Sequence, residues 1–599
     1  MMQKLGRMKN RSRHTFKTCL LLVLLFLPLE KAMAQSIPVG DFLESQFRVL
    51  QLLSDSTTQL SFSNRPVSRA SYDALFESSG LDGQSLWTES HGRKAYDVSI
   101  RNYTLTLGSY DPEILNTYND ELPYGENNGS AWYGKGLNTE FKAGFYVTSK
   151  YLSATFRPHF SYQENADFRT PRFIPKYPDG SDRYVAQGIL PEDTLADRID
   201  RPFRFGPDSY STFDLGHSSI RLHYQNVEVG LSKEPLWWGP GVQYALMMSN
   251  NAPGLKHAFM GSREPIPLPF NAGHLEFRLI GAWPEDSKYF DLNLDISPHK
   301  EILADRYLRD RFMNGLNLIY SPSFIPNFHV GLSRVVHQYI PDTGLRFEDY
   351  FQAFAPFPKP DERVLDTFRD ESYFEDKNHL SSIYFRWVFP ESNAEVYGEY
   401  MKNNQSFNFR DLLMEPQHGR AYTFGFQKII ESNWIDFFKI NAEFNSLLPG
   451  EIDDVRPQTY YYTHQSVKQG HTNGGQLLGA AIGPGSTSQY LGADAYHKKG
   501  SVGFFIQRMV DNDLFHFEYY QRFFTQGGFK DQFRHRANLN IGLKSSYLFR
   551  DILFSGRFVW NKNFSYGRFN YGEFPINYET REGTDVINLQ FQLSARYLF

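Results

Sequence analysis

The last thirteen residues of the chain, 587–599, alternate between apolar and polar side chains. Every odd position is apolar, and every even position except Leu598 is polar. An alternation with a period of two over this length predicts a β-strand with one apolar face and one polar face. The apolar positions are Ile587, Leu589, Phe591, Leu593, Ala595, Tyr597 and Phe599.

Such a strand suits a membrane barrel better than a soluble sheet, which rarely ends on so long and exposed an edge. Closing an outer-membrane barrel removes the edge, and lipid covers the apolar face. Tyr597 and Phe599 also resemble the C-terminal assembly signal of bacterial outer-membrane proteins. Aromatic residues make up 16% of the chain, which fits the aromatic girdles of such barrels. We therefore predict an all-β transmembrane barrel, the alternative being a large soluble β-sandwich protein.

The N-terminal 34 residues have the pattern of a secretory signal peptide. A basic segment precedes the apolar stretch 19–29, which is too short to span a bilayer. The sequence Ala32-Met33-Ala34 then provides a cleavage site. We expect cleavage near Ala34 and location in the outer membrane.

The mature chain is acidic and has no cysteine. Removing residues 1–34 takes away seven Lys/Arg and one Asp/Glu, which leaves 55 basic and 66 acidic residues and a net charge of −11. This balance argues against nucleic acid as a partner. Cys19 lies in the signal peptide, so we expect no disulfide and no thiol chemistry. The mature chain also has no stretch of eighteen apolar residues, so no transmembrane helix is expected.

A short segment near the mature N-terminus has helical rather than strand periodicity. Asp41 is placed to cap a helix, with Glu44 as its capping-box partner, and apolar residues then recur at helical spacing up to Leu53. Residues 71–77 fit a second short helix. We predict a helical periplasmic element over 35–95 and a barrel over 96–599; the alternative is a surface helix that only packs.

From about residue 97 onward, alternating segments of about ten residues dominate, which is the length that a tilted membrane strand needs. Examples are 103–107, 220–224, 227–231, 275–279 and 539–543. This density suits roughly 16–18 strands. The irregular stretches 163–209, 284–311, 340–378 and 445–475 are expected to be long outer loops. Some would fold over the mouth of the barrel, and Phe347 to Phe354 fits a helical turn.

Motifs for catalysis or cofactor binding are weak. Gly129 to Lys135 has the spacing of a phosphate loop, but Gly136 replaces the expected Ser or Thr, and Trp132 and Tyr133 are bulky for such a loop. His464 and His471 have no third ligand at suitable spacing. No nucleophile elbow or zinc-protease motif occurs. We expect no cofactor, no metal and no enzyme activity.

One strand carries a run of polar residues on the face opposite the lipid. Glu395, Tyr397 and Glu399 share this face, and Lys439 and Glu443 share the corresponding face of a later segment. Four residues of strand place Glu395 and Glu399 roughly 13 Å apart, farther than the roughly 5–9.5 Å between glycosidase carboxyl groups. We predict that these five residues line a polar lumen.

The most distinctive stretch runs from Glu234 to Gly254. It contains Trp237-Trp238, clustered glycine and proline, and the pair Asn250-Asn251. Indole rings stack on sugar faces and amides bind hydroxyl groups, so these four residues are candidates for polysaccharide binding. The alternative is that the tryptophans pack inside the barrel or in a girdle while the glycines make the turns.

These motifs together resemble the Wzi-type capsule assembly family. The resemblance also rests on segments 128–136, 216–220, 386–391, 395–400 and 474–479, which occur in the family's order. It implies an outer-membrane barrel of about eighteen antiparallel strands with a helical periplasmic element. It further implies a lectin-like role without catalysis, holding capsular or exopolysaccharide at the cell surface.

Two main hypotheses about function follow. The first is a barrel that binds surface polysaccharide in capsule assembly; the second is a channel for oligosaccharides or other polar solutes. A plugged lumen favours binding, and an open charged lumen favours a channel. A barrel enzyme acting on glycans or lipids is a third, weaker hypothesis. Other expected partners are outer-membrane lipid and, through the C-terminal strand, the outer-membrane assembly machinery.

Overall fold

The computed structural model describes most of the predicted barrel. The described residues are 35–54, 59–79, 85–87, 95–100, 103–168, 199–202, 204–288, 309–355, 377–403, 409–448, 450, 460–464, 466–511, 536–564, 566 and 585–599. The predicted signal peptide, its cleavage site and parts of the predicted long loops lie outside these residues. Among the described residues no helix is long and apolar enough to cross a membrane.

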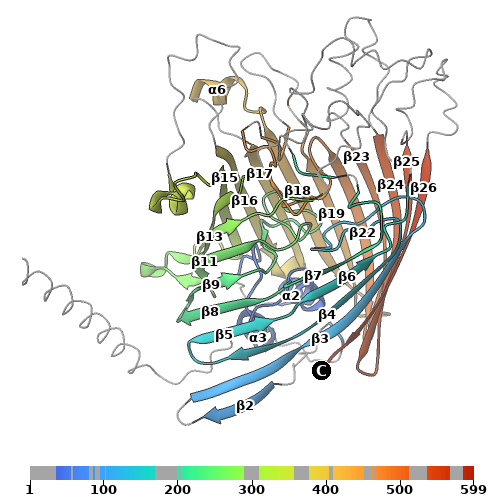
Figure 1. The fold of residues 1–599 in the computed structure, drawn as a ribbon. Helices are drawn as coiled ribbons and strands as arrows, with labels where there is room; N and C mark the ends of the chain where they lie inside the picture. Colours follow the sequence, from blue (N-terminus) through green and yellow to red (C-terminus); the bar gives the residue numbers. More distant parts are fainter. Residues whose placement is uncertain are drawn as a thin grey trace, which may run out of the picture.

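The dominant feature is a closed antiparallel β-barrel (Figure 1). Its strands are β3 (Tyr103–Asn119), β4 (Gly136–Thr148), β5 (Leu152–Phe156), β6 (His159–Gln163), β7 (Tyr210–Asp214), β8 (Ser219–Tyr224), β9 (Val227–Ser232), β11 (Lys256–Ser262), β13 (Gly273–Trp283), β14 (Arg311–Pro322), β15 (Phe328–Tyr339), β16 (Lys377–Phe389), β17 (Ala394–Asn403), β18 (Arg420–Glu431), β19 (Phe437–Ser446), β22 (Thr487–His497), β23 (Gly500–Asp511), β24 (Arg536–Phe549), β25 (Ile552–Phe564) and β26 (Val586–Tyr597). β5 with β6 forms one interrupted strand beside β4, and β7 with β8 forms the next. Short β2 (Ala95–Ile100) and β12 (Ile266–Pro267) add to β3 and β13. Counted this way, the described residues form an eighteen-strand barrel, as predicted.

The C-terminal segment closes the barrel, which confirms the prediction from its alternation. β26 pairs with β25 on one side and with β3 on the other. Leu593 is 68% exposed on the outer wall, whereas Asn588 is fully buried on the inner face. The polar positions of β26 therefore face the lumen and the apolar positions face outward.

The outer wall of the barrel is apolar around its circumference. Exposed apolar side chains alternate with buried inward-facing ones on most strands, as the pleat of a strand requires. They include Phe145, Ile220, Leu231, Leu332, Ile383, Phe424, Leu491, Val502 and Leu543. Such a wall is stable only against lipid, so the barrel spans a membrane through its strands.

The two ends of the barrel differ in the length of their connections. Very short turns join β8 to β9, β22 to β23 and β24 to β25 at one end, and η6 (Pro390–Ser392) joins β16 to β17 there. The connection from β17 to β18 at the opposite end is longer and contains α6 (Phe409–Met414), which lies near the top of Figure 1. Because short turns face the periplasm in bacterial outer-membrane barrels, the long-loop end is the outer end.

Two helices lie inside the barrel at its short-turn end. α2 (Phe42–Leu53) and α3 (Arg69–Ser78) form within the predicted helical element. Residues 86–87 join this element to the wall: Leu86 N–H donates to Lys498 O at 2.8 Å, and the Trp87 indole donates to Gly500 O at 3.0 Å. Lys498 belongs to the short β22–β23 turn, so the helices close the periplasmic end of the lumen.

The capping of α2 differs in one detail from the prediction. Asp41 caps the helix by accepting a hydrogen bond from Leu43 N–H. Glu44 does not complete a capping box, because its carboxylate accepts from Gly40 N–H at 2.7 Å instead of from Asp41 N–H. The expected partner of Glu44 was therefore wrong by one residue.

Loops from the outer end fill the middle of the lumen. β10 (Trp237–Trp238) pairs with β1 (Asn64–Arg65), and β20 (Thr472–Asn473) pairs with β21 (Gln476–Leu477). These loops share one apolar core with inward-facing wall residues such as Met313, Val335 and Met401. The loop members of this core include Trp238, Tyr244, Leu246, Met247, Met248, Tyr461, Tyr462, Leu477 and Leu478. We call the described residues of the three segments 35–79, 233–255 and 460–486 together the plug.

The segment from Phe347 to Phe354 is helical as predicted, but it does not cross the mouth. It forms the 3-10 helix η4. Asn314 of β14 donates to Tyr350 O at 2.7 Å and accepts from Ala353 N–H at 2.7 Å. Asn314 follows Met313, which points into the core, so η4 lies against the outer wall of the barrel. The prediction that this segment folds over the mouth was wrong.

Candidate functional site

The predicted lumen residue Glu395 lies on β17 and binds the plug. Its carboxylate accepts from Arg48 Nη2 of α2 at 2.6 Å and from Arg386 Nη2 of β16 at 2.5 Å. Gln427 Nε2 of β18 donates to the same carboxylate at 2.6 Å. All of these side chains are buried. Glu395 thus joins helix α2 to the barrel wall through charge-assisted hydrogen bonds.

Glu443 on β19 holds a different part of the plug. Its carboxylate accepts from three consecutive backbone N–H groups, those of Val242 at 2.7 Å, Gln243 at 3.0 Å and Tyr244 at 3.0 Å. The Tyr397 hydroxyl donates to it at 2.8 Å. A carboxylate that receives several N–H groups fixes the conformation of the donating loop. Glu443 therefore clamps the loop that follows Trp238.

The remaining predicted lumen residues divide into two groups. Glu399, which is 2% exposed, lies against the plug, and Leu246 N–H donates to it at 3.4 Å. Lys439 Nζ instead lies 3.8 Å from Asp494, a carboxylate that also pairs with Lys544 at 2.9 Å. The Arg48 guanidinium of the plug lies 5.2 Å from the centre of the Tyr397 ring. Glu395, Tyr397, Glu399 and Glu443 thus contact the plug, whereas Lys439 belongs to an ion cluster on the wall.

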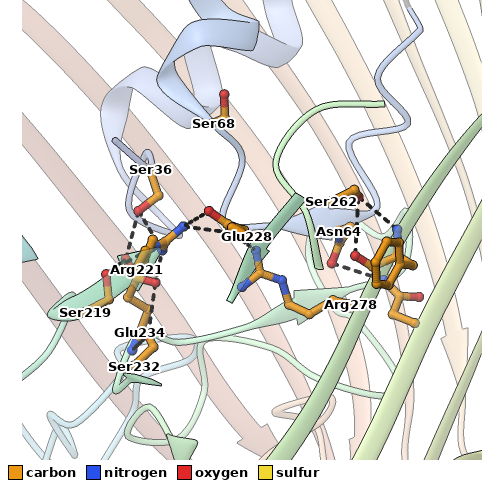
Figure 2. A network of polar contacts seen from close by, with 12 residues as sticks. Ser36, Asn64, Ser68, Ser219, Arg221, Glu228, Ser232, Glu234, Ser262 and Arg278 are labelled. Carbon is orange, nitrogen blue, oxygen red and sulfur yellow. Dashed lines mark hydrogen bonds and ion pairs between the residues drawn. The ribbon is translucent and has the colours of Figure 1, made fainter. Parts of the chain in front are cut away.

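A second group of contacts joins the plug segment 233–255, called the Trp237 loop below, to the barrel wall. Figure 2 shows these contacts. Arg221 of β8 pairs with Glu234 of the loop and, at 3.1 Å, with Glu228 of β9. Arg278 of β13 donates to Glu228 at 2.9 Å. Ser36, at the start of the described chain, donates to Glu234 at 2.8 Å. These contacts connect two of the three plug segments, 35–79 and 233–255, to strands β8, β9 and β13.

The electrostatic environment keeps Glu234 ionised within this anchor. Burial alone would raise the pKa of Glu234, but the adjacent Arg221 and His217 hold the pKa below its usual value. A buried carboxylate is tolerated because it is paired and hydrogen-bonded in this way.

The predicted sugar-binding tryptophans are buried within the plug. Trp238 is fully buried in the shared core, and Trp237 is 5% exposed. The Arg65 guanidinium lies 4.3 Å from the centre of the Trp237 ring, where it makes a cation–π contact. Both indoles therefore pack inside the barrel, as the alternative hypothesis for this stretch had it. Their role in binding polysaccharide stays a prediction.

Asn250 and Asn251 connect three loops to one another. Asn250 Nδ2 donates to Asn127 O at 3.1 Å, and Asn251 Nδ2 donates to Leu477 O at 3.1 Å. Asn127 N–H donates to Asn251 Oδ1 at 3.4 Å. The amides thereby hold together the loop after β3, the Trp237 loop and the loop before β22. Their binding of polysaccharide also stays a prediction.

His471, considered as a metal ligand, supports the plug. Its Nε2–H donates to Met247 O at 2.6 Å, so its Nδ1 accepts from His337 Nε2 at 2.8 Å. Burial lowers the pKa of His471 to about 4, which keeps the ring neutral. Among the described residues no group of three or more His, Cys, Asp or Glu is placed to hold a metal ion.

A polar groove lies at the outer rim, between the end of β15, the start of β16 and residues 466–468. Its volume is about 660 Å³, within the range of roughly 300–1,000 Å³ for ligand pockets. The charged residues that line it are Arg309, Arg346, Glu348, Asp349, Lys377 and Lys468. No sequence pattern pointed to this groove, because its lining comes from four separate segments. The helical pattern of residues 347–354 was the one available signal.

The barrel wall and the filled lumen together define the class of protein. The chain is an outer-membrane β-barrel whose interior is filled by its own helices and loops. The family model described as capsule assembly protein Wzi matches residues 116–545, which is more than half of the chain. The protein therefore belongs to the Wzi capsule assembly family.

One solved structure shows the same fold. The structure of Wzi from Escherichia coli is described as an outer-membrane, carbohydrate-binding β-barrel involved in group 1 capsule assembly. It covers 94% of this chain and 100% of its own at 11% identity, with a TM-score of 0.57. OccAB3 from Acinetobacter baumannii covers 84% of this chain and 100% of its own at 9% identity; its TM-score of 0.38 is too low to inform function. A search of curated proteins finds no match.

Proposed function

We propose that this protein binds capsular or exopolysaccharide and retains it at the cell surface, without catalysing a reaction. The observation that carries the proposal is the filled lumen of a barrel that belongs to a capsule assembly family. The carbohydrate binding described for E. coli Wzi supports it. A channel needs an open polar path, whereas here Trp238, Tyr244 and Tyr462 are fully buried in a core that spans from the plug to the wall.

An enzyme role has little support from the carboxylates of the lumen. Glu395 is occupied by two arginines and Glu443 by three backbone N–H groups. Both are buried, so neither faces a space where a glycosidic bond fits. We propose that Glu395, Tyr397, Glu399 and Glu443 act as supports of the plug.

We also propose the roles of the signal peptide, of the two parts of the mature chain and of the C-terminal strand. Residues 1–34 direct secretion and are cleaved near Ala34, residues 35–95 form the periplasmic element, and residues 96–599 form the barrel. The assembly machinery recognises the C-terminal strand, and outer-membrane lipid covers the apolar wall.

Deleting the gene is expected to release the polymer without stopping its synthesis. Total polysaccharide should stay at the parental level, while the cell-bound fraction falls and the fraction in the medium rises. Assaying the polymer separately in washed cells and in the supernatant checks this. A plasmid copy of the gene serves as the control and should restore retention. Unchanged cell-bound capsule in the deletion strain would rule out the proposal.

A further inference from the structure

The rim groove carries an excess of positive charge at the outer end of an acidic protein. Its described lining contains four cationic side chains, Arg309, Arg346, Lys377 and Lys468, and two carboxylates. The predicted mature chain has a net charge of −11. Charges farther apart than roughly 8 Å are largely screened at physiological salt, so the local excess decides what the groove attracts.

The two carboxylates do not use up the donors of the cations. Arg346 Nη1 lies 3.6 Å from Glu348, and both side chains are more than two-thirds exposed. Lys377 Nζ lies 3.7 Å from Asp349. Both distances exceed the ~2.7–2.9 Å of a charge-assisted hydrogen bond. Asp349 is directed instead toward the backbone, where it accepts from Arg346 N–H at 2.8 Å. Among the described residues, the Arg346 guanidinium and the Lys377 ammonium group therefore keep donors for a ligand.

The floor of the groove is fixed and partly apolar. The Tyr339 hydroxyl donates to Gln469 Oε1 at 2.8 Å and accepts from Lys468 N–H at 3.0 Å. These bonds hold the ring in place beside Ile340 and Pro341, which also line the groove. A sugar ring has apolar C–H faces and polar edges, so a fixed aromatic ring flanked by cations suits a sugar that bears a carboxylate.

We propose that this groove binds an acidic polysaccharide, with the carboxylates of its uronic-acid units at Arg346, Lys377 and Lys468. The proposal rests on the proposed function and adds the class of polymer and the place where it binds. The groove opens at the outer end of the barrel, where a polymer held at the cell surface is accessible. A phosphorylated lipid headgroup is the competing anion that the experiment must separate from the polymer.

The test compares binding by purified full-length barrels in detergent at low salt. The acidic probe is oligogalacturonate and the neutral probe is maltodextrin of the same length. The groove variant carries Arg346→Gln and Lys468→Gln. The matched control carries Lys498→Gln and Lys499→Gln, which remove two exposed charges from a short turn at the opposite end. Heat-dependent migration on denaturing gels confirms that each barrel is folded.

The wild-type protein is expected to bind oligogalacturonate more tightly than maltodextrin, with affinity that falls as salt is added. The groove variant should lose about tenfold or more in affinity for oligogalacturonate, because two charge-assisted contacts are removed. The control should bind as the wild type does. Equal binding of both probes, no binding of oligogalacturonate, or an unchanged affinity in the groove variant would each overturn the proposal.

Two further arms separate the possible causes of failure. If the groove variant loses binding to vesicles that contain lipopolysaccharide but keeps its affinity for oligogalacturonate, the groove serves lipid phosphate and the proposal is wrong. In cells, a groove variant that retains polymer as the wild type does would overturn the groove assignment while the retention function stands. A wild-type copy that fails to restore retention in the deletion strain would instead overturn the proposed function.

Discussion

Replacing Glu395 with alanine is expected to release helix α2 from the barrel wall. The carboxylate is the shared acceptor for Arg48 of the helix and Arg386 of the wall. Without it, two buried guanidinium groups face each other without a counter-charge. Breaking a buried ion pair by removing one partner costs ~3–5 kcal/mol, enough to expose the helix for a substantial fraction of the time. Hydrogen exchange of residues 42–53 in the purified barrel should rise sharply.

The matched control for this prediction is Asp494→Ala. Asp494 is also a buried wall carboxylate with two cationic partners, Lys439 and Lys544, but both partners belong to the wall. Exchange of residues 42–53 should stay near the wild-type rate in this variant. The same rates in the Glu395 and Asp494 variants would contradict the role of Glu395 as a link between helix and wall.

Replacing Glu443 with alanine is expected to loosen the loop 242–246 and to make the barrel conduct ions. The change removes the acceptor of three backbone N–H groups. One of these N–H groups belongs to Tyr244, which is fully buried. Each buried donor left without a partner costs ~1–3 kcal/mol. Because this loop contributes Tyr244 and Leu246 to the core that fills the lumen, its displacement opens a path through the barrel. Single-channel recording in planar bilayers should show openings that the wild-type protein lacks.

Asn441→Ala provides the control for Glu443→Ala. Asn441 lies two residues earlier on the same strand and is buried on the same inner face. Its side-chain oxygen lies beside Gly492 of the neighbouring strand β22 and has no hydrogen-bond partner among the described residues. Conductance should therefore stay at the wild-type level. Equal conductance in both variants would show that Glu443 does not hold the loop.

The fold was largely predictable because its signals are local. Alternation along β26 follows from the pleat of a strand between lipid and lumen, and it reads directly from residues 587–597. The helix start at Asp41 is also set by neighbouring residues. Likewise, the inward direction of Glu395, Tyr397 and Glu399 follows from the exposure of their neighbours to lipid.

What the lumen residues bind was not predictable in the same way. Glu395 and Arg48 are separated by 347 residues, and Glu443 meets a loop 200 residues away. No periodicity within one strand records such partners. The same reason explains the tryptophans: Trp237 and Trp238 have the composition of a sugar site, but only the closed barrel shows that they are covered on all sides. The composition of residues 234–254 marked an unusual loop, but it did not show whether the loop folds into the lumen or outward.

The groove at the rim lies at the limit of what a sequence shows. Arg309, Arg346, Lys377 and Lys468 lie in four segments that the ends of β14, β15 and β16 bring together. Arg309 and Lys377 each belong to a run of only three charged residues, 309–311 and 375–377, and Arg346 and Lys468 have no charged neighbour directly beside them. The aromatic residues of η4 did indicate a helix, but its position on the outer wall depends on the distant Asn314.

The most direct test of a plugged, polysaccharide-binding barrel measures polymer binding and ion conductance on one preparation of the wild-type protein. The polymer is the polysaccharide shed by the deletion strain, and conductance is recorded in planar bilayers with and without it. We predict saturable binding of the polymer together with no steady conductance, because the plug fills the lumen. Steady conductance without detectable binding would contradict the filled lumen and the binding function together, and would favour a channel.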